Sequence, residues 1–131
     1  MMRELTVIPG TRIALFRSLG AVEFEDRMKN LERMAQFCKE HGIKDLIVDI
    51  SQQVSETRTM QMFTLGTSVP EILRGIRIAV VCQPFDEETK FGETVAANRG
   101  AISSSFTSVE DAQRWLEGKD IAPGKPDRSV S

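Results

Sequence analysis

The sequence predicts a layered α/β fold, with a mixed, mostly parallel sheet of about five strands and helices packed against it. Three short apolar runs, 43–50, 76–82 and 101–106, alternate with segments of helical periodicity. Strands that alternate with helices pair in parallel, because each helix carries the chain back to the starting edge of the sheet. Ligands of such sheets usually bind beside the loops that follow the carboxyl ends of the strands.

An N-terminal hairpin adds two strands to this prediction. Residues 5–8 alternate weakly between apolar and polar, Pro9 and Gly10 mark a turn, and a second apolar run follows at 12–17. Two short runs separated by such a turn signal are typical of an antiparallel hairpin.

The first predicted helix, 23–41, has clear helical periodicity. Its apolar residues recur every three or four positions and form one face: Phe24, Met28, Leu31, Ala35 and Cys38. Acidic residues open the segment, and Gly42 follows it at the position where a left-handed residue ends many helices. We expect the apolar face to pack on the core.

The second predicted helix, 59–68, should stop or kink at Pro70, which lacks an N–H and clashes with the preceding turn. Ser68 and Glu71 have the spacing of a capping box, so we expect a short extra turn that reaches Arg74.

Two apolar rows on this second helix predict self-association. One row has the spacing of core residues: Met60, Phe63 and Thr67. The other is displaced around the helix axis: Met62, Leu65 and Val69. A helix that is apolar on two sides needs a second partner. We expect a homodimer through the second row; the alternative is that another segment of the same chain covers it.

Two shorter helices complete the pattern. The helix 87–98 is predicted to begin after Asp86 as its N-cap, with Phe91 and Val95 facing inward. The spacing of Thr107–Glu110 is that of a capping box and predicts a last helix after the third apolar run.

The length of 131 residues fits one domain with its own core. We assign residues 1–117 to this α/β domain. Residues 118–131 consist largely of glycine, proline and polar or charged residues, so we expect them to form a disordered C-terminal tail.

Composition and charge argue against several classes of protein. The net charge is −2 and the charged residues are scattered, so no clustered basic surface for nucleic acid is expected. No apolar run reaches the roughly 18–20 residues that span a bilayer, and the N-terminus lacks the apolar segment of a secretory signal. We therefore expect a cytoplasmic protein that is not an integral membrane protein, with Cys38 and Cys82 as buried thiols.

The sequence contains no recognisable catalytic or cofactor-binding set. His41 is the only histidine, so a Ser-His-Asp triad is implausible and the donors for a metal site are few. No glycine-rich phosphate-binding motif follows a predicted strand. We therefore expect no catalytic activity, no metal and no cofactor.

Asp49, near the end of a predicted strand, has two interpretations. As a phospho-acceptor it lacks the acidic cluster and the lysine that receiver domains provide. As a metal ligand it begins a sequence similar to D-x-S-x-S, but Gln53 replaces the final serine. The favoured interpretation is structural, with Asp49 bonded to backbone or hydroxyl groups.

The loops after the strands that end at Ile50 and Cys82 are the predicted binding site. The candidate residues are Asp49, Ser51, Ser55, Thr57, Gln83 and Phe85. Free N–H groups at the starts of the two following helices favour an anionic group there. Arg99, which follows the third helix, is a further candidate; its simpler role is to cap that helix.

The order of elements resembles that of STAS domains of the anti-sigma-factor-antagonist type. Four segments are similar to the SpoIIAA-like family, also described as STAS/SEC14-like proteins: 46–50, 76–81, 89–100 and 106–116. STAS antagonists carry a phosphorylatable serine in an Asp-Ser-Ser/Ala-Gly type motif at the start of the second helix. The corresponding stretch here, 54–59, has neither the Asp-Ser pair nor the glycine.

This resemblance implies a non-catalytic regulatory or protein-interaction module, whose partner is another protein or a second copy of the chain. The alternative, implied by the related SEC14-like proteins, is a small apolar-ligand or lipid-binding protein. A lipid binder should have a sizeable apolar pocket beneath its helices. An interaction module should have a filled core and an apolar surface patch.

Overall fold

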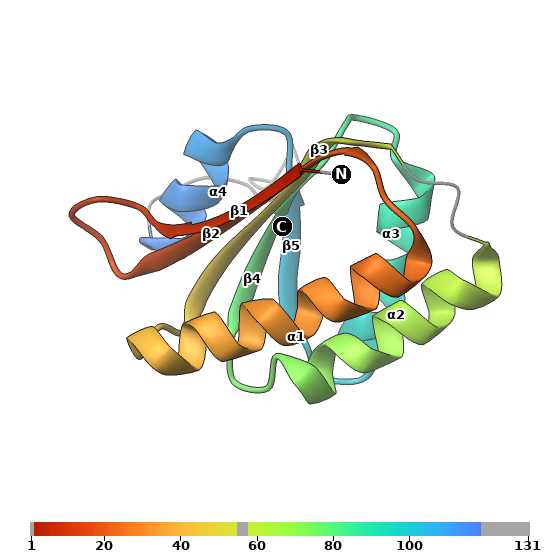
Figure 1. Ribbon diagram of the computed structural model, residues 1–131, viewed down its shortest axis with the longest axis horizontal. Helices are drawn as coiled ribbons and strands as arrows, with labels where there is room; N and C mark the ends of the chain where they lie inside the picture. Colours follow the sequence, from red (N-terminus) through yellow and green to blue (C-terminus); the bar gives the residue numbers. More distant parts are fainter. Residues whose placement is uncertain (1, 55–57, 119–131) are drawn as a thin grey trace, which may run out of the picture.

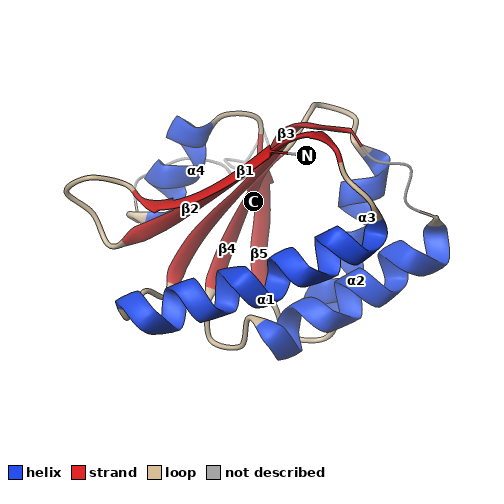
Figure 2. Cartoon of the chain, viewed as in Figure 1, coloured by secondary structure: helices blue, strands red, loops and turns tan. Residues whose placement is uncertain are grey.

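The computed structural model describes residues 2–54 and 58–118, and Figures 1 and 2 show how its elements are arranged. Along the chain these are β1 (Met2–Val7), β2 (Ile13–Ala21), α1 (Phe24–His41), β3 (Asp45–Val54), α2 (Thr59–Ile72), β4 (Arg77–Val81), α3 (Glu87–Asn98), β5 (Ile102–Phe106) and α4 (Val109–Leu116). The strands form one five-stranded sheet in the order β1-β2-β3-β4-β5. β1 is antiparallel to β2, and the remaining pairs are parallel. The predicted fold class is confirmed.

The sheet separates two hydrophobic clusters. In Figure 1, α1, α2 and α3 lie on one side of the sheet and α4 lies on the other. Successive residues of a strand point to opposite faces. Leu46 therefore packs beneath α1 and α2, whereas its neighbour Ile47 packs against α4.

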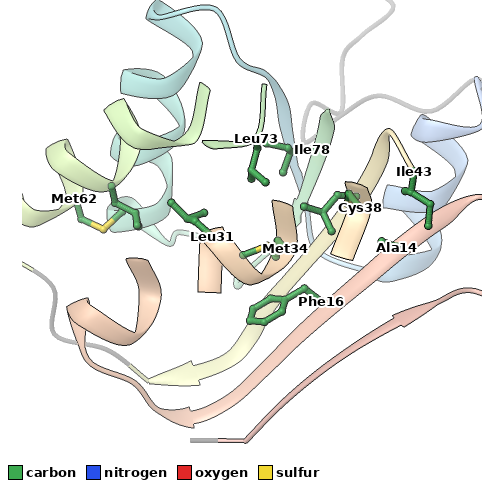
Figure 3. Packing of buried hydrophobic residues seen from close by; sticks show 11 residues of the cluster. Ala14, Phe16, Leu31, Met34, Cys38, Ile43, Met62, Leu73 and Ile78 are labelled. Atoms are coloured by element: carbon green, nitrogen blue, oxygen red, sulfur yellow. The ribbon is translucent and has the colours of Figure 1, made fainter. Parts of the chain in front are cut away.

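The larger cluster lies between α1, α2 and the centre of the sheet (Figure 3). Its buried residues are Ala14, Phe16, Leu31, Met34, Cys38, Ile43, Leu46, Met62, Leu65, Leu73 and Ile78. Met34 belongs to the buried face of α1, whereas Phe24, Met28 and Ala35 are only partly buried at its margin. The helix ends as predicted, because Gly42 takes the left-handed conformation with φ of 63°.

The second helix differs from the prediction because it does not break at the proline. It runs from Thr59 to Ile72 and includes Pro70. Pro70 has no N–H to donate to the carbonyl oxygen four residues earlier. Because Pro70 lies near the carboxyl end of the helix, this one hydrogen bond is lost and the earlier turns keep theirs. Ser68 does not start a new turn, since its hydroxyl donates to the carbonyl oxygen of Thr64 at 2.8 Å.

The two apolar rows of α2 have exchanged the roles predicted for them. Met62 and Leu65 are buried, with 3% and 8% of their surface exposed, and Val69 packs against the same cluster. Met60 and Phe63 are the exposed row, at 72% and 39%. The self-association face predicted at Met62, Leu65 and Val69 is therefore wrong, because the chain's own core uses it. That the chain forms a homodimer stays a prediction, but this row of residues is not its interface.

Gly66 explains which row turns inward. A Cβ atom at Gly66 would lie only 2.8 Å from the carbonyl oxygen of Gly92 in α3, so α2 can approach α3 this closely only with glycine there. Met62 and Val69 lie one turn before and one turn after Gly66, on the same side of the helix. The close approach at Gly66 therefore turns the row that contains Met62 and Val69 toward α3 and the sheet.

Three further details differ from the prediction. β3 continues past its predicted end to Val54, because its last residues pair with β2. Phe91 is 40% exposed, since α3 turns other residues toward the core. The N-cap of α4 is Ser108, whose hydroxyl accepts the N–H of Asp111 at 3.1 Å, and not Thr107.

Candidate functional site

Asp49 is the centre of a polar cluster near the carboxyl edge of the sheet. Its residue is 6% exposed, and its carboxylate accepts hydrogen bonds from Arg17 Nε at 3.0 Å and from the N–H and hydroxyl of Ser51 at 3.1 and 2.7 Å. The structural interpretation of Asp49 is thus confirmed. Arg17 was not predicted as part of this site. The available signal was an arginine inside an apolar strand, where a charge needs a partner.

A β-bulge shapes the same edge. β2 and β3 pair regularly as far as Arg17 opposite Asp49, but Leu19 then lies opposite Gln52. β3 therefore has one residue more than β2 in this stretch, and a bulge of this kind re-aims the side chains beyond it. Gln53 consequently lines a cavity on the helix side of the sheet.

Gln83 joins the loop after β4 to β3. Its Nε2 donates to the carbonyl oxygen of Ser51 at 2.8 Å. Further along this loop, Phe85 is 84% exposed and has a φ of 67°. The left-handed conformation costs a non-glycine residue about 1–2 kcal/mol. The structure thus brings Asp49, Ser51 and Gln83 to one edge, with Phe85 exposed beside them.

The remaining predicted residues do not join this cluster. Ser55 and Thr57 lie outside the described residues. Arg99 is the C-cap of α3, at the end of that helix that lies away from this edge. Its guanidinium is 5.6 Å from the centroid of the Phe63 ring, so it packs on the exposed row of α2.

The start of α3 is already occupied by carboxylates. Asp86 caps the helix as predicted and accepts the N–H and the hydroxyl of Thr89 at 2.9 and 2.8 Å. Glu87 and Glu88 follow in the first turn. An anionic ligand would meet negative charge here. The anion preference predicted for this edge stays a prediction, and these carboxylates count against it at α3.

A cavity of about 110 Å³ lies between the helices α1, α2 and α3 and the sheet. Its wall is mostly apolar, with Leu31 and Met34 from α1, Met62 from α2, and Val48 and Val80 from the central strands. In Figure 3 the labelled side chains of Leu31, Met34 and Met62 converge on the space between the two helices and the strands.

At one end the cavity adjoins a polar depression of about 180 Å³. Both are lined by Ile50, Gln53 and Thr89, and the depression adds Asp86 and Glu88. Arg27 of α1, 8% exposed, also lines the cavity and donates to the Glu88 carboxylate at 2.9 Å. The apolar space therefore opens beside a set of charged and hydrogen-bonding groups.

Both cysteines are buried free thiols, as predicted. Burial raises the pKa of Cys38 from 9.0 to about 11. Burial also raises the pKa of Cys82 from 9.0 to about 11, and the negative charges of Asp86 and Glu93 act in the same direction. Neither thiol is therefore ionised at neutral pH, and neither is a nucleophile.

These raised pKa values predict a loss of stability in alkaline solution. Between pH 9 and 11 the thiols ionise in the unfolded chain and stay protonated in the folded one, so the free energy of unfolding falls as pH rises. Each thiol contributes roughly 2–3 kcal/mol to this fall. Urea unfolding at pH 8 and pH 10.5 measures it, and the Cys82→Ala variant should show a clearly smaller pH dependence. An identical dependence in that variant would contradict the prediction.

Metal-binding and membrane-spanning features are not found in residues 2–54 and 58–118. No group of three or more His, Cys, Asp or Glu side chains in these ranges could hold a metal ion. None of the helices in these ranges is long and apolar enough to cross a membrane.

The sequence matches no protein-family model and no curated protein. Solved structures, in contrast, share its fold. The unphosphorylated form of the anti-sigma factor antagonist SpoIIAA is similar with a TM-score of 0.58 at 12% identity, over 89% of this chain and 99% of that one. The chain therefore has the SpoIIAA-like, or STAS, fold.

Two further structures support the same conclusion. An uncharacterized protein of the DUF3478 family from Shewanella loihica PV-4, with a SpoIIAA-like fold, is similar with a TM-score of 0.55 at 18% identity, over 88% of this chain and 92% of that one. The phosphorylated form of SpoIIAA, a Bacillus cell fate determinant, has a TM-score of 0.51 at 8% identity, over 88% and 99%. At these identities the similarity establishes the fold alone.

Proposed function

We propose that the chain is a non-catalytic regulatory module of the STAS type that acts by binding another protein. The observation that carries the proposal is Phe85, whose ring is 84% exposed on a backbone of φ 67°. Strained backbone conformations of this kind concentrate at functional sites. Aromatic side chains, phenylalanine included, are enriched at protein interfaces.

The surroundings of Phe85 support this proposal. The bond from Gln83 to Ser51 ties the beginning of the loop to β3, and the pair of Arg17 and Asp49 holds β3 to β2. An anchor on a fixed support loses less conformational entropy when it binds. The similarity to SpoIIAA, which is an anti-sigma factor antagonist, supports a protein as the partner.

The lipid-binding alternative has less support. The cavity of about 110 Å³ is well below the roughly 300–1,000 Å³ of pockets that enclose drug-sized ligands. A space of this size is small for enclosing the acyl chain of a lipid. A protein partner at the polar edge is therefore the function that we favour.

Replacing Phe85 with alanine is expected to weaken partner binding by about tenfold to a hundredfold, as loss of an aromatic anchor does. The partner is first isolated by affinity capture, with the tagged protein as bait and an extract of the cells that produce the protein. The purified partner is then titrated with the wild type and the variant by calorimetry.

Ile102→Ala is the matched control. Ile102 is also an exposed apolar residue, at 53%, but it begins β5 at the opposite edge of the sheet. This variant should bind like the wild type. Phe85→Asn should lose binding while it keeps the wild-type stability, because asparagine tolerates the left-handed conformation. Equal affinities for Phe85→Ala and Ile102→Ala would refute the proposal.

A further inference from the structure

The cavity beneath α1, α2 and α3 leaves the centre of the sheet incompletely covered. Val48, Ile50 and Val80 lie on the two central strands and face the cavity, yet they are only partly buried. Protein interiors are normally packed without voids much larger than a water molecule. The space of about 110 Å³ is several times the roughly 10–15 Å³ that is enough to hold one water.

The size of the cavity limits what can occupy it. A dry cavity of roughly 150 Å³ with aliphatic and aromatic walls accepts benzene. The volume of about 110 Å³ is of the same order, so a phenyl ring or a short branched alkyl group fits. Met62 contributes to the wall, and its flexible thioether can adjust to such a group.

The mouth of the cavity, where it meets the polar depression, is charged, and this charge restricts the head group that a ligand can have. The carboxylates of Asp86 and Glu88 line the polar depression, and Glu93 lines the cavity itself. Arg27 is the cation among the lining residues, and it is paired with Glu88 at 2.9 Å. The mouth therefore has an excess of negative charge, which repels an anionic head group and attracts a cationic one.

Gln53 and Thr89 give the mouth hydrogen-bonding capacity as well. Both residues line the cavity and the depression, so they lie where the apolar wall becomes polar. The β-bulge in β3 is the reason that Gln53 is on this side of the sheet. An amide and a hydroxyl can bond to an ammonium, a hydroxyl or an amide group.

We propose that this cavity is a binding site for a small amphipathic molecule with one phenyl-sized or short alkyl group and a cationic or neutral polar head. The apolar group lies among Val48, Met62 and Val80, and the head group lies beside Gln53, Thr89 and the carboxylates. Phe85 does not line this site, and the proposal does not depend on the protein partner proposed above.

Three probes that differ only in the head group test the charge preference. Benzylamine, benzyl alcohol and phenylacetate are each titrated into the full-length protein at pH 7, and the NMR signals of the methyl groups of Val48 and Val80 are followed. The amine and the alcohol should bind with dissociation constants on the order of 1 mM, as expected for ligands of this size. Phenylacetate should bind at least about tenfold more weakly because of the carboxylates.

Variants of one wall residue test the location. Val80→Phe fills the cavity and should weaken benzyl alcohol binding by about tenfold or more, the loss of a buried phenyl group. Leu15→Phe is the matched control, because Leu15 is also a partly buried strand residue but packs against the cluster on the α4 side. It should bind like the wild type.

If the Val80→Phe variant does not fold, Val80→Ala tests the same location. This variant enlarges the same cavity, so it should bind the bulkier 4-methylbenzyl alcohol more tightly than the wild type does. The proposal is overturned if no probe binds, if phenylacetate binds as tightly as benzylamine, or if the Val80 variants bind all probes like the wild type.

Discussion

Replacing Asp49 with alanine is expected to lower the free energy of unfolding by about 2–4 kcal/mol. The substitution removes the acceptor for Arg17 Nε and for both donors of Ser51, at a residue that is only 6% exposed. Charged hydrogen bonds at buried positions contribute more than exposed ones, and donors left without an acceptor carry a desolvation cost. Water reaches Arg17, whose side chain is 35% exposed, and this limits the loss. Urea denaturation at pH 7 measures the effect.

Asp45→Ala is the matched control on the same strand. Asp45 accepts two hydrogen bonds from Arg77 at 2.9 and 3.1 Å, but these side chains are 26% and 39% exposed. Arg77 also donates to the carbonyl oxygen of Leu116, so it keeps a partner. This pair is bidentate but more exposed at its carboxylate than Asp49, so its loss should cost less, about 1 kcal/mol. Equal losses in the two variants would mean that burial does not determine the contribution of Asp49.

Gly66→Ala is expected to destabilise the fold by about 1–3 kcal/mol, the usual cost of overpacking. In an exposed helix the same change would be stabilising, because alanine is the better helix former by about 1 kcal/mol. Here the new Cβ would lie 2.8 Å from the backbone oxygen of Gly92 and 2.9 Å from Cβ of Val95. Neither atom can move without displacing α3. The melting temperature of the variant tests the sign of the effect.

Gly92→Ala provides the comparison. Its Cβ would meet Cε of Met62 at 2.7 Å, and this is the end of a flexible side chain beside a cavity. Met62 can turn away at little cost, so the helix propensity of alanine should offset most of the loss. We expect a stability within about 1 kcal/mol of the wild type. A larger loss for Gly92→Ala than for Gly66→Ala would contradict the assignment of Gly66 as the contact that fixes α2.

The fold was predictable to the extent that local signals determine it. The cap at Asp86 and the periodicity after it predict the bounds of α3, and the structure has them at Glu87–Asn98. Both rows of α2 contain large apolar residues, and the choice between them depends on the approach of Gly66 to α3. The extension of β3 to Val54 likewise depends on pairing with β2. Such contacts between distant segments have no signature in the residues themselves.

The candidate site was predictable only in part, for a related reason. Asp49, Ser51 and Gln83 were found because neighbouring parallel strands end at one edge of the sheet. The pairing of Arg17 with Asp49 depends on the register of β2 against β3. The cavity depends on how three helices pack over the sheet, and no spacing of residues in the sequence predicts a space that they fail to fill.

The order of the strands has a consequence for how the molecule can form. Each strand of β2 to β5 lies beside the strand that precedes it in the chain, so no strand has to be inserted between two that are already paired. During synthesis the sheet can therefore grow from one side, one strand at a time, as the chain emerges from the ribosome. The pairing of β1 with β2 closes only a turn, and each later pairing closes only a loop that contains one helix, which keeps the entropic cost of each step small.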